Sequence, residues 1–251
     1  MNKRKRESDM PVGVITNVLS VTLGGIVGTL FGGKLSARFK ENLTLIFSVC
    51  ALGMGISSII LMKNMPAVIL SVVVATAVGL SLHIGDWITK GGQMLQKPIS
   101  KMFTNQKSEY SQEEFFSMVV TVIVLFCTSG TGIYGCIDSG MTGDHTILIS
   151  KSILDFFTAL IFACNLGAVV SVIAIPQLFI FLALYLAAGL IYPMTTPDMI
   201  ADFKACGGFL LLATGFRMMK VKEFPIADMI PAMILVMPVS WIWSNYIVTF
   251  F

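Results

Sequence analysis

Charged residues are scarce in this chain of 251 residues, of which only 12% are Asp, Glu, Lys or Arg and 55% are hydrophobic. An average soluble domain carries roughly 25% charged residues, so this sequence lacks the side chains that would cover a soluble core with a charged shell. The mean hydropathy is +0.84. The composition therefore excludes an ordinary soluble enzyme or binding domain and predicts apolar surroundings.

Histidine and closely spaced cysteine are scarce as well. The chain has two histidines, and its five cysteines stand singly, without a C-x-x-C pair. Neither histidine has a second ligand at helical spacing, so we expect no metal site, and lone cysteines in apolar runs behave as small hydrophobic side chains. The net charge of +3 is small, so nucleic-acid binding is not expected. We predict no cofactor.

The motif GTGIYG at 130–135 has the glycine spacing of a dinucleotide-binding turn. That fingerprint also requires a short strand before the glycines and further βαβ units. The apolar run before it, 115–128, is longer than a usual strand, so we reject nucleotide binding. No nucleophile–base pattern is evident elsewhere, and we do not expect an enzyme.

Long uncharged runs make up most of the sequence, and several of them reach the length of roughly 20 residues that a helix needs to cross a bilayer. Candidate spans lie near 12–33, 43–62, 66–85, 115–136, 146–173, 176–193, 199–219 and 226–248. We expect Pro176 near the start of a span, whereas Pro231 and Pro238 should kink the last one. The sequence thus predicts an all-α, polytopic transmembrane bundle of about seven or eight helices, forming one domain over 12–251.

Two parts of the chain are too polar to cross a bilayer. One is the basic tail over 1–11, and the other is the segment over 86–114, in which Trp87 is typical of an interfacial anchor. Basic residues also follow the first, third and seventh spans, and the positive-inside rule places those loops in the cytoplasm. The basic tail would then lie outside, so the side that the N-terminus faces stays open.

Residues 50–74 and 206–234 resemble each other, each with a cysteine, a glycine-containing helix, a basic turn and a proline. This similarity suggests repeat halves over 12–85 and 176–250, linked by the polar segment and a central helix pair at 115–173. The predicted orientations match the inverted repeats of many transporters. Because membrane helices use few residue types, chance similarity is the alternative.

Small residues recur at every fourth position of the first span. They are Thr16, Ser20, Gly24, Gly28 and Gly32. Such a face lets helix backbones approach closely in lipid, so it indicates packing, within the chain or in a homo-oligomer, or else a gate where the helix slides. Gly132 belongs to a second small-residue series in the fourth span, and Asn17 brings an amide that needs a partner inside the membrane.

The fifth span contains the clearest candidate for a functional site, because Asp144, Lys151 and Asp155 share one helical face. Lys151 and Asp155 are four residues apart and can pair. A helix that starts near Thr146 places Asp155 about 14 Å along its axis, close to the middle of a hydrocarbon core about 30 Å thick. A charge there costs about 2.5–3.5 kcal/mol. A structural ion pair and a solute, ion or proton site are both open interpretations.

These residues together predict a small secondary transporter or permease. A solute or ion would bind at Asp155 with Lys151 as its counter-charge, and Asn17, Asp138 and Asp144 would line the approach. The expected partners are the lipid bilayer and an unknown small solute or ion. A non-transporting membrane scaffold or accessory subunit is the alternative function.

Three stretches of the sequence carry a family resemblance. They are "GVITNVLSVTLGGIVGTLFGGKLSARFKENL", "DSGMTGDHTILISKSILDFFTALIFACNLG" and "GGFLLLATGFRMMKVKEFPIADMIPAMIL". The pattern resembles the YqgA/YdfK-like bacterial inner-membrane proteins of unknown function, over nearly the whole chain from Val12. The resemblance implies a multi-pass protein of the bacterial cytoplasmic membrane, and it supplies neither a substrate nor catalytic residues.

Overall fold

The fold is known from a computed structural model that describes residues 10–31, 35–101, 112–127 and 129–247. Within these residues the chain is helical and contains no β-strand, so the predicted all-α class is confirmed. The chain forms two compact units. Unit 1 combines residues 1–41 with 88–190, and unit 2 combines 42–87 with 191–251.

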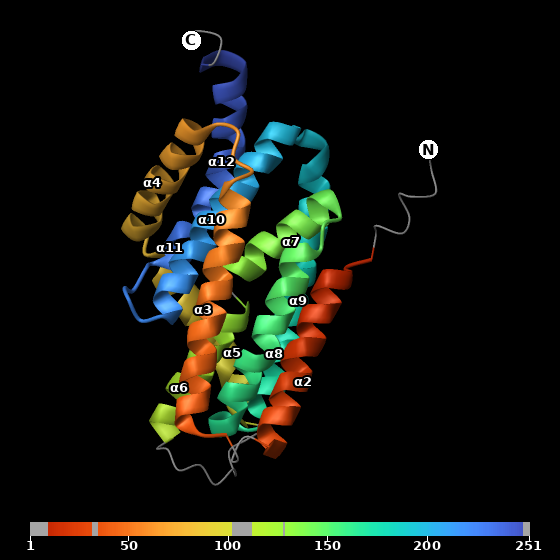
Figure 1. Cartoon of the computed structure of the whole chain (residues 1–251), viewed down its shortest axis with the longest axis vertical. Coiled ribbons are helices and arrows are strands. Elements are labelled where there is room, and N and C mark those ends of the chain that lie inside the picture. The colour runs from red at the N-terminus through yellow and green to blue at the C-terminus, as the bar shows by residue number, and fades with distance from the viewer. Residues whose placement is uncertain (1–9, 32–34, 102–111, 128, 248–251) are drawn as a thin grey trace. The chain divides into compact units, whose positions relative to one another are not determined.

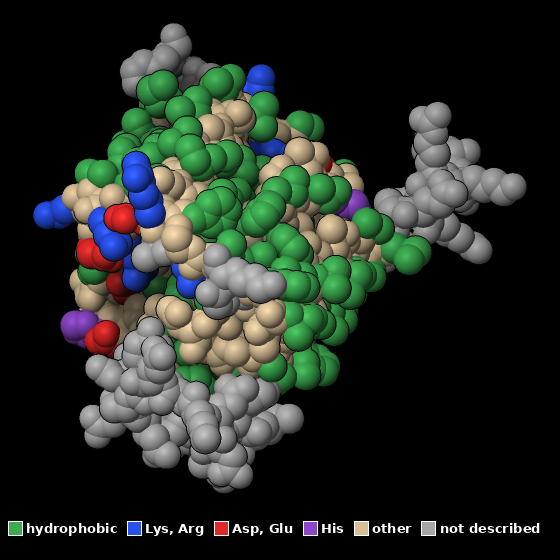
Figure 2. All heavy atoms as spheres, turned by 60° about the horizontal axis from the view of Figure 1, so that its bottom comes forward, with side chains coloured by type: hydrophobic (Ala, Val, Ile, Leu, Met, Phe, Trp, Pro, Cys, Tyr) green, Lys and Arg blue, Asp and Glu red, His purple; other side chains and the backbone are tan. Residues whose placement is uncertain are grey.

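Seven of the described helices are long and apolar enough to cross a membrane, and an eighth span results if the helix pair α4–α5 is counted as one broken span. This agrees with the predicted seven or eight. Large aliphatic side chains are exposed along these helices. On α2 (Val12–Phe31) the exposed residues include Ile15, Leu19, Leu23, Ile26 and Leu30. In the face that Figure 2 shows, hydrophobic side chains form broad patches. The chain is an integral membrane protein that contacts lipid.

Unit 1 contains α2, most of α5 (Ile84–Lys101), α6 (Gln112–Cys127), α7 (Gly130–Thr142), α8 (Thr146–Leu166) and α9 (Val169–Ile191). Helices α2 and α8 lie side by side (Figure 1). A Cβ atom at Gly24 would meet the carbonyl of Phe156, and one at Gly28 would meet that of Leu160. Because both contacts advance together along the two helices, α2 and α8 run in parallel, and glycine lets their backbones touch.

The boundary between α8 and α9 differs from the predicted one, which lay at residues 173–176. Gly167 ends α8 with φ 66° and ψ −151°, a conformation that is essentially restricted to glycine. Helix α9 therefore begins at Val169, and Pro176 lies inside it. The expectation that Pro176 lies near a helix start is wrong, because the glycine ends the preceding helix first.

The predicted span over 115–136 consists of two helices. Helix α6 ends at Cys127 and α7 begins at Gly130, where the Ser129 side chain accepts a hydrogen bond from the Gly132 backbone N–H. Serine is a favoured N-cap because it satisfies one of the free N–H groups of the first turn. The glycines of GTGIYG thus lie in the first turns of a helix, and a helix rather than a strand precedes them.

Unit 2 contains α3 (Ala37–Ile59) from Asn42 onward, α4 (Met65–Ser81), α10 (Pro197–Met218), α11 (Ile226–Met229) and α12 (Pro231–Ile242). It also contains a short 3-10 helix (Tyr192–Met194) and a π-helical turn (Trp243–Ile247). Helices α3 and α10 touch through glycine, since a Cβ at Gly55 would lie 2.8 Å from the Gly208 carbonyl oxygen. The last predicted span is interrupted at Ile230, directly before Pro231.

The two similar segments 50–74 and 206–234 both lie in unit 2. The repeat halves 12–85 and 176–250 stay a prediction. The inverted repeat itself stays a prediction. Of the polar segment 86–114, residues up to 101 form the described part of α5, in which Trp87 is exposed.

Candidate functional site

Four polar side chains meet inside unit 1. Asp155 Oδ2 accepts hydrogen bonds from Lys151 Nζ at 2.5 Å and from Asn17 Nδ2 at 2.9 Å. Asn17 Oδ1 in turn accepts one from Gln177 Nε2 at 2.8 Å. We call these residues the polar network. It brings together the predicted Asn17, Lys151 and Asp155, and it adds Gln177, which the sequence interpretation missed.

Local helix geometry explains why these side chains meet. Lys151 and Asp155 are one turn apart on α8 and point to the same side, and the parallel packing of α2 brings Asn17 beside them. Asp155 is the tenth residue of α8, which has 21 residues. It therefore lies about 14 Å along a helix about 30 Å long, at the middle of the span. This is the predicted position along the helix, and the depth of Asp155 in the bilayer stays a prediction.

The polar network is closed off from solvent. Asn17 and Gln177 are 0% exposed, Lys151 is 4% exposed and Asp155 is 7% exposed. A buried charge is tolerated when a partner of opposite charge and hydrogen bonds compensate for its lost hydration. The network supplies both to the Asp155 carboxylate.

Two clusters of buried apolar residues flank the polar network along the helix axes. One cluster includes Val14 of α2, Leu148 of α8 and Phe181 of α9. The other includes Val21, Ala159 and Ala174 of the same three helices, and the network residues lie between the two clusters in each helix. The polar network thus lies between two apolar layers.

The network holds oxygen atoms that lack donors. Gln177 Oε1 is buried and has no hydrogen-bond partner. Within the described part of the chain, both donors to Asp155 bind Oδ2, and none reaches Oδ1. Gln177 Nε2 also lies 3.5 Å from the carbonyl oxygen of Phe126, in the last turn of α6. The network therefore contains one buried amide oxygen, Gln177 Oε1, without a donor.

The remaining predicted site residues occupy different surroundings. Asp138 is buried on α7, where Thr142 Oγ1 lies 3.3 Å from its Oδ1. Asp144 is exposed in the turn before α8, and its Oδ1 accepts from the Thr146 N–H at 3.0 Å. Both contacts are local, and neither of them connects Asp138 or Asp144 to the polar network. Their role in lining an approach stays a prediction.

The predicted packing residues also differ in their surroundings. Gly24 and Gly28 lie against the α8 backbone, and Ser20 is half-buried on α2. A Cβ at Gly132 would lie 2.5 Å from the Phe181 ring, so glycine at this position allows the Phe181 side chain of α9 to pack against α7. Gly32 lies outside the described residues.

Unit 2 contains a buried carboxylate that the sequence interpretation missed. Asp202 is 0% exposed. Its Oδ1 accepts from the backbone N–H groups of Lys63 at 2.8 Å and Asn64 at 2.9 Å, directly before α4. Its Oδ2 accepts from Asn64 Nδ2 at 2.9 Å and from Ser240 Oγ at 2.7 Å. Asp202 thus binds the start of α4 to α10 and α12. An acidic residue inside a predicted span was the signal that could have revealed it.

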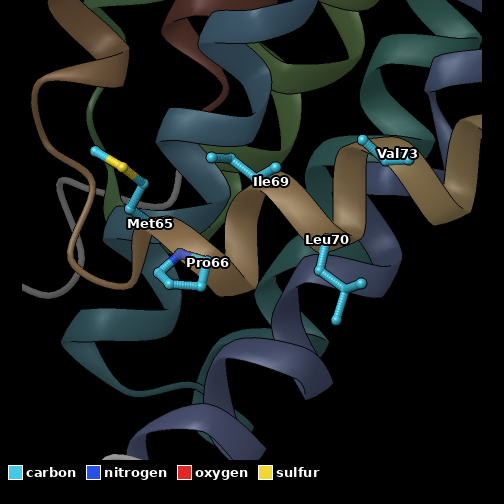
Figure 3. Close-up of a pocket in the computed structure, with 5 residues that line it drawn as sticks. All are labelled: Met65, Pro66, Ile69, Leu70 and Val73. Atoms are coloured by element: carbon cyan, nitrogen blue, oxygen red, sulfur yellow. The ribbon is translucent and has the colours of Figure 1, made fainter.

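A further carboxylate, on α11, holds the start of α5, shortly after α4 ends at Ser81. Asp228 Oδ1 accepts from the Gly85 N–H at 2.8 Å, and a Cβ at Gly79 would collide with the Asp228 carbonyl. The outer side of α4 carries a shallow apolar groove (Figure 3). The groove is lined by Met65, Pro66, Ile69, Leu70 and Val73. Without a polar lining side chain it suits acyl chains better than a polar solute.

Metal-binding side chains do not gather anywhere in the described ranges. These ranges contain no group of three His, Cys, Asp or Glu side chains arranged to hold a metal ion. The polar network remains the best candidate site, because it alone among the clusters described above combines a buried ion pair with open acceptor atoms.

The family model described as "Protein of unknown function (DUF554)" matches residues 12–241. The chain belongs to this family. The DUF554 chain is 45% identical over 237 residues to "Uncharacterized protein YqgA" of Escherichia coli (strain K12), covering 94% of this chain and 99% of that protein. It is 22% identical over 223 residues to "Uncharacterized membrane protein YdfK" of Bacillus subtilis (strain 168), covering 89% and 93%. No solved structure matches it.

The predicted resemblance is thereby confirmed for the DUF554 chain, and one relative is named as a membrane protein. The polar network lies within the matched residues 12–241. Its chemical role has to be argued from its geometry.

Proposed function

We propose that this DUF554 protein is a secondary transporter for a small solute or ion in the bacterial inner membrane, and that it is not an enzyme. The observation that carries the proposal is the ion pair of Lys151 and Asp155, buried at the middle of α8. An ionisable group inside a span is costly, and in membrane proteins such groups typically mark substrate, ion or proton pathways.

The surroundings of the pair support this function. Asn17 and Gln177 extend the site across α2, α8 and α9. Beside the site, one predicted span is interrupted between α6 and α7. Broken helices near the bilayer midplane are a recurring feature of solute and ion sites in transporters. The two apolar clusters on either side of the network are candidates for the layers that open alternately.

The test is uptake into proteoliposomes of purified protein, screened first with solute mixtures and imposed ion gradients. Asp155→Asn keeps the size of the side chain and removes its charge, and Lys151→Ala removes the counter-charge. Both variants should abolish uptake of a solute that the wild type moves. Unchanged uptake in both would contradict the proposal.

A scaffold or accessory subunit is the competing function, and the close α2–α8 packing at Gly24 and Gly28 is compatible with it. It assigns only stability to the polar network. It also predicts that a partner protein co-purifies after cross-linking and that charge-neutral variants keep this partner.

A further inference from the structure

We infer that the outer side of α4 is a binding site for an anionic phospholipid. The lipid phosphate pairs with the ammonium group of Lys63, which lies directly before the helix, and one acyl chain lies in the apolar groove of α4 between Met65 and Val73. The inference concerns the surface of unit 2 and does not depend on the proposed transport function.

The shape of the groove suits a single hydrocarbon chain. Met65, Ile69 and Val73 follow one another at every fourth position and form one row, while Pro66 and Leu70 form a second row beside it (Figure 3). Rows at this spacing run along a helix and leave a groove between them. The groove extends about 12 Å along the helix axis, from eight residues at 1.5 Å each. Apart from Pro66, the lining side chains are between 48% and 62% exposed, so the groove is open to lipid.

Contacts in unit 2 indicate that α4 starts at the level of the lipid headgroups. Lys63 and Asn64 connect α3 to α4, two helices that belong to different candidate spans. Asn64 Nδ2 donates to Ser244 Oγ at 3.0 Å. The rings of Trp241 and Tyr246, which are exposed on either side of this serine in the sequence, contact each other with centroids 5.7 Å apart. Exposed tryptophan and tyrosine are typical of the boundary between bilayer and water. The groove thus leads from the headgroup level along α4 into the apolar region, as an acyl chain does.

Lys63 supplies the charge that selects an anionic headgroup. Its side chain is exposed, and no carboxylate in the described part of the chain forms an ion pair with it. Its backbone N–H donates to Asp202 Oδ1 at 2.8 Å, which holds the residue at the mouth of the groove and leaves the ammonium group available. One lysine near a negatively charged lipid surface strengthens binding about fivefold. The quaternary ammonium of a zwitterionic choline lipid would oppose this attraction.

The experiment is native mass spectrometry of the purified full-length protein in detergent, titrated with phosphatidylglycerol or phosphatidylcholine that carry the same oleoyl chains. The wild type should bind one phosphatidylglycerol about fivefold more tightly than one phosphatidylcholine. Lys63→Gln should remove this preference, and Lys63→Arg, which keeps the charge, should retain it. Glycerol phosphate has a phosphate but no acyl chain, and it should not displace the lipid at the same concentration.

Matched controls separate this site from general effects of charge and size. Lys222→Gln removes another exposed lysine of unit 2, beyond the end of α10 that is opposite to Asp202, and should leave the preference unchanged. Val73→Phe places a ring in the groove and should weaken the binding of both lipids. Val74→Phe makes the same change at an exposed position that does not line the groove, and it should bind as the wild type does. Because all these side chains are exposed, each variant should keep the wild-type Tm.

Several results would overturn the inference. One is equal binding of the two lipids by the wild type. Another is an equal loss of phosphatidylglycerol binding in Lys63→Gln and Lys222→Gln, which would indicate general attraction to an anionic lipid. Displacement by glycerol phosphate would show a phosphate site that does not use the groove. If Val73→Phe leaves lipid binding unchanged and instead separates a dimer present in the wild-type spectra, the groove holds a second copy of the chain.

Discussion

Asp202→Asn tests how strongly unit 2 depends on the carboxylate that holds the start of α4. In the wild type, Asp202 accepts four hydrogen bonds. Asparagine has one oxygen, which can keep the two backbone N–H groups of Lys63 and Asn64. Its NH2 group would then face Asn64 Nδ2 and Ser240 Oγ, so at least one donor would lose its acceptor.

The expected loss of stability follows from these contacts. A hydrogen bond to a charged group contributes about 1.5–3 kcal/mol and a neutral one about 0.5–1.5 kcal/mol. The retained bonds therefore weaken and the lost ones disappear, while relief from burying a charge offsets part of the cost. We expect a net loss of about 2–4 kcal/mol. Each kcal/mol shifts Tm by about 2–4 °C in chains of this size, so Tm should fall by roughly 4–16 °C.

The chain offers its own reporters and its own control. Cys127, Cys136 and Cys206 are buried, so a thiol-reactive dye in detergent reports their exposure on heating. Asp198→Asn changes an exposed aspartate one turn earlier on α10 and should leave Tm within about 1 °C of the wild type, as surface substitutions do. The prediction is refuted if Asp202→Asn has the same Tm as the wild type, or if Asp202→Asn and Asp198→Asn lower Tm by the same amount.

Three further substitutions test the packing. Gly24→Ala should lower Tm because its Cβ would meet the α8 backbone. Gly53→Ala is the control and should leave Tm unchanged, since nothing lies within 4 Å of a Cβ there. The same Tm for both variants would contradict the close contact. Gly167→Ala should lower the free energy of unfolding by about 1–3 kcal/mol, because the backbone conformation of Gly167 is nearly restricted to glycine. A melting curve like that of the wild type would contradict this, because alanine would then fit the turn between α8 and α9 without strain.

The sequence was sufficient to predict the membrane class, the number of spans and the position of Asp155 near the middle of its helix. Hydrophobic length determines each of these, and a helical period of 3.6 residues then places Lys151 and Asp155 together. It was insufficient at helix ends. Pro176 looked like a helix start, and only the backbone geometry at Gly167 shows that α8 stops earlier.

The missing site residues have a common cause. Gln177 and Asp202 act through contacts with residues more than 100 positions away, such as Asn17 and Asn64, and no local pattern encodes such pairing. The charges of Lys151 and Asp155 stand out in the sequence, while an amide in a long apolar run does not. Applying the cost of buried polar groups to amides as well would have identified Gln177.

The most direct test of the central claim compares stability with transport in the double variant Asp155→Asn, Lys151→Met. Replacing both members of a buried ion pair by neutral side chains of similar size is often neutral or stabilising, by about 1–4 kcal/mol, so the protein should melt near or above the wild-type temperature. We predict that this folded variant moves no solute or ion in proteoliposomes. Wild-type flux in the double variant would show that the pair only holds the helices together.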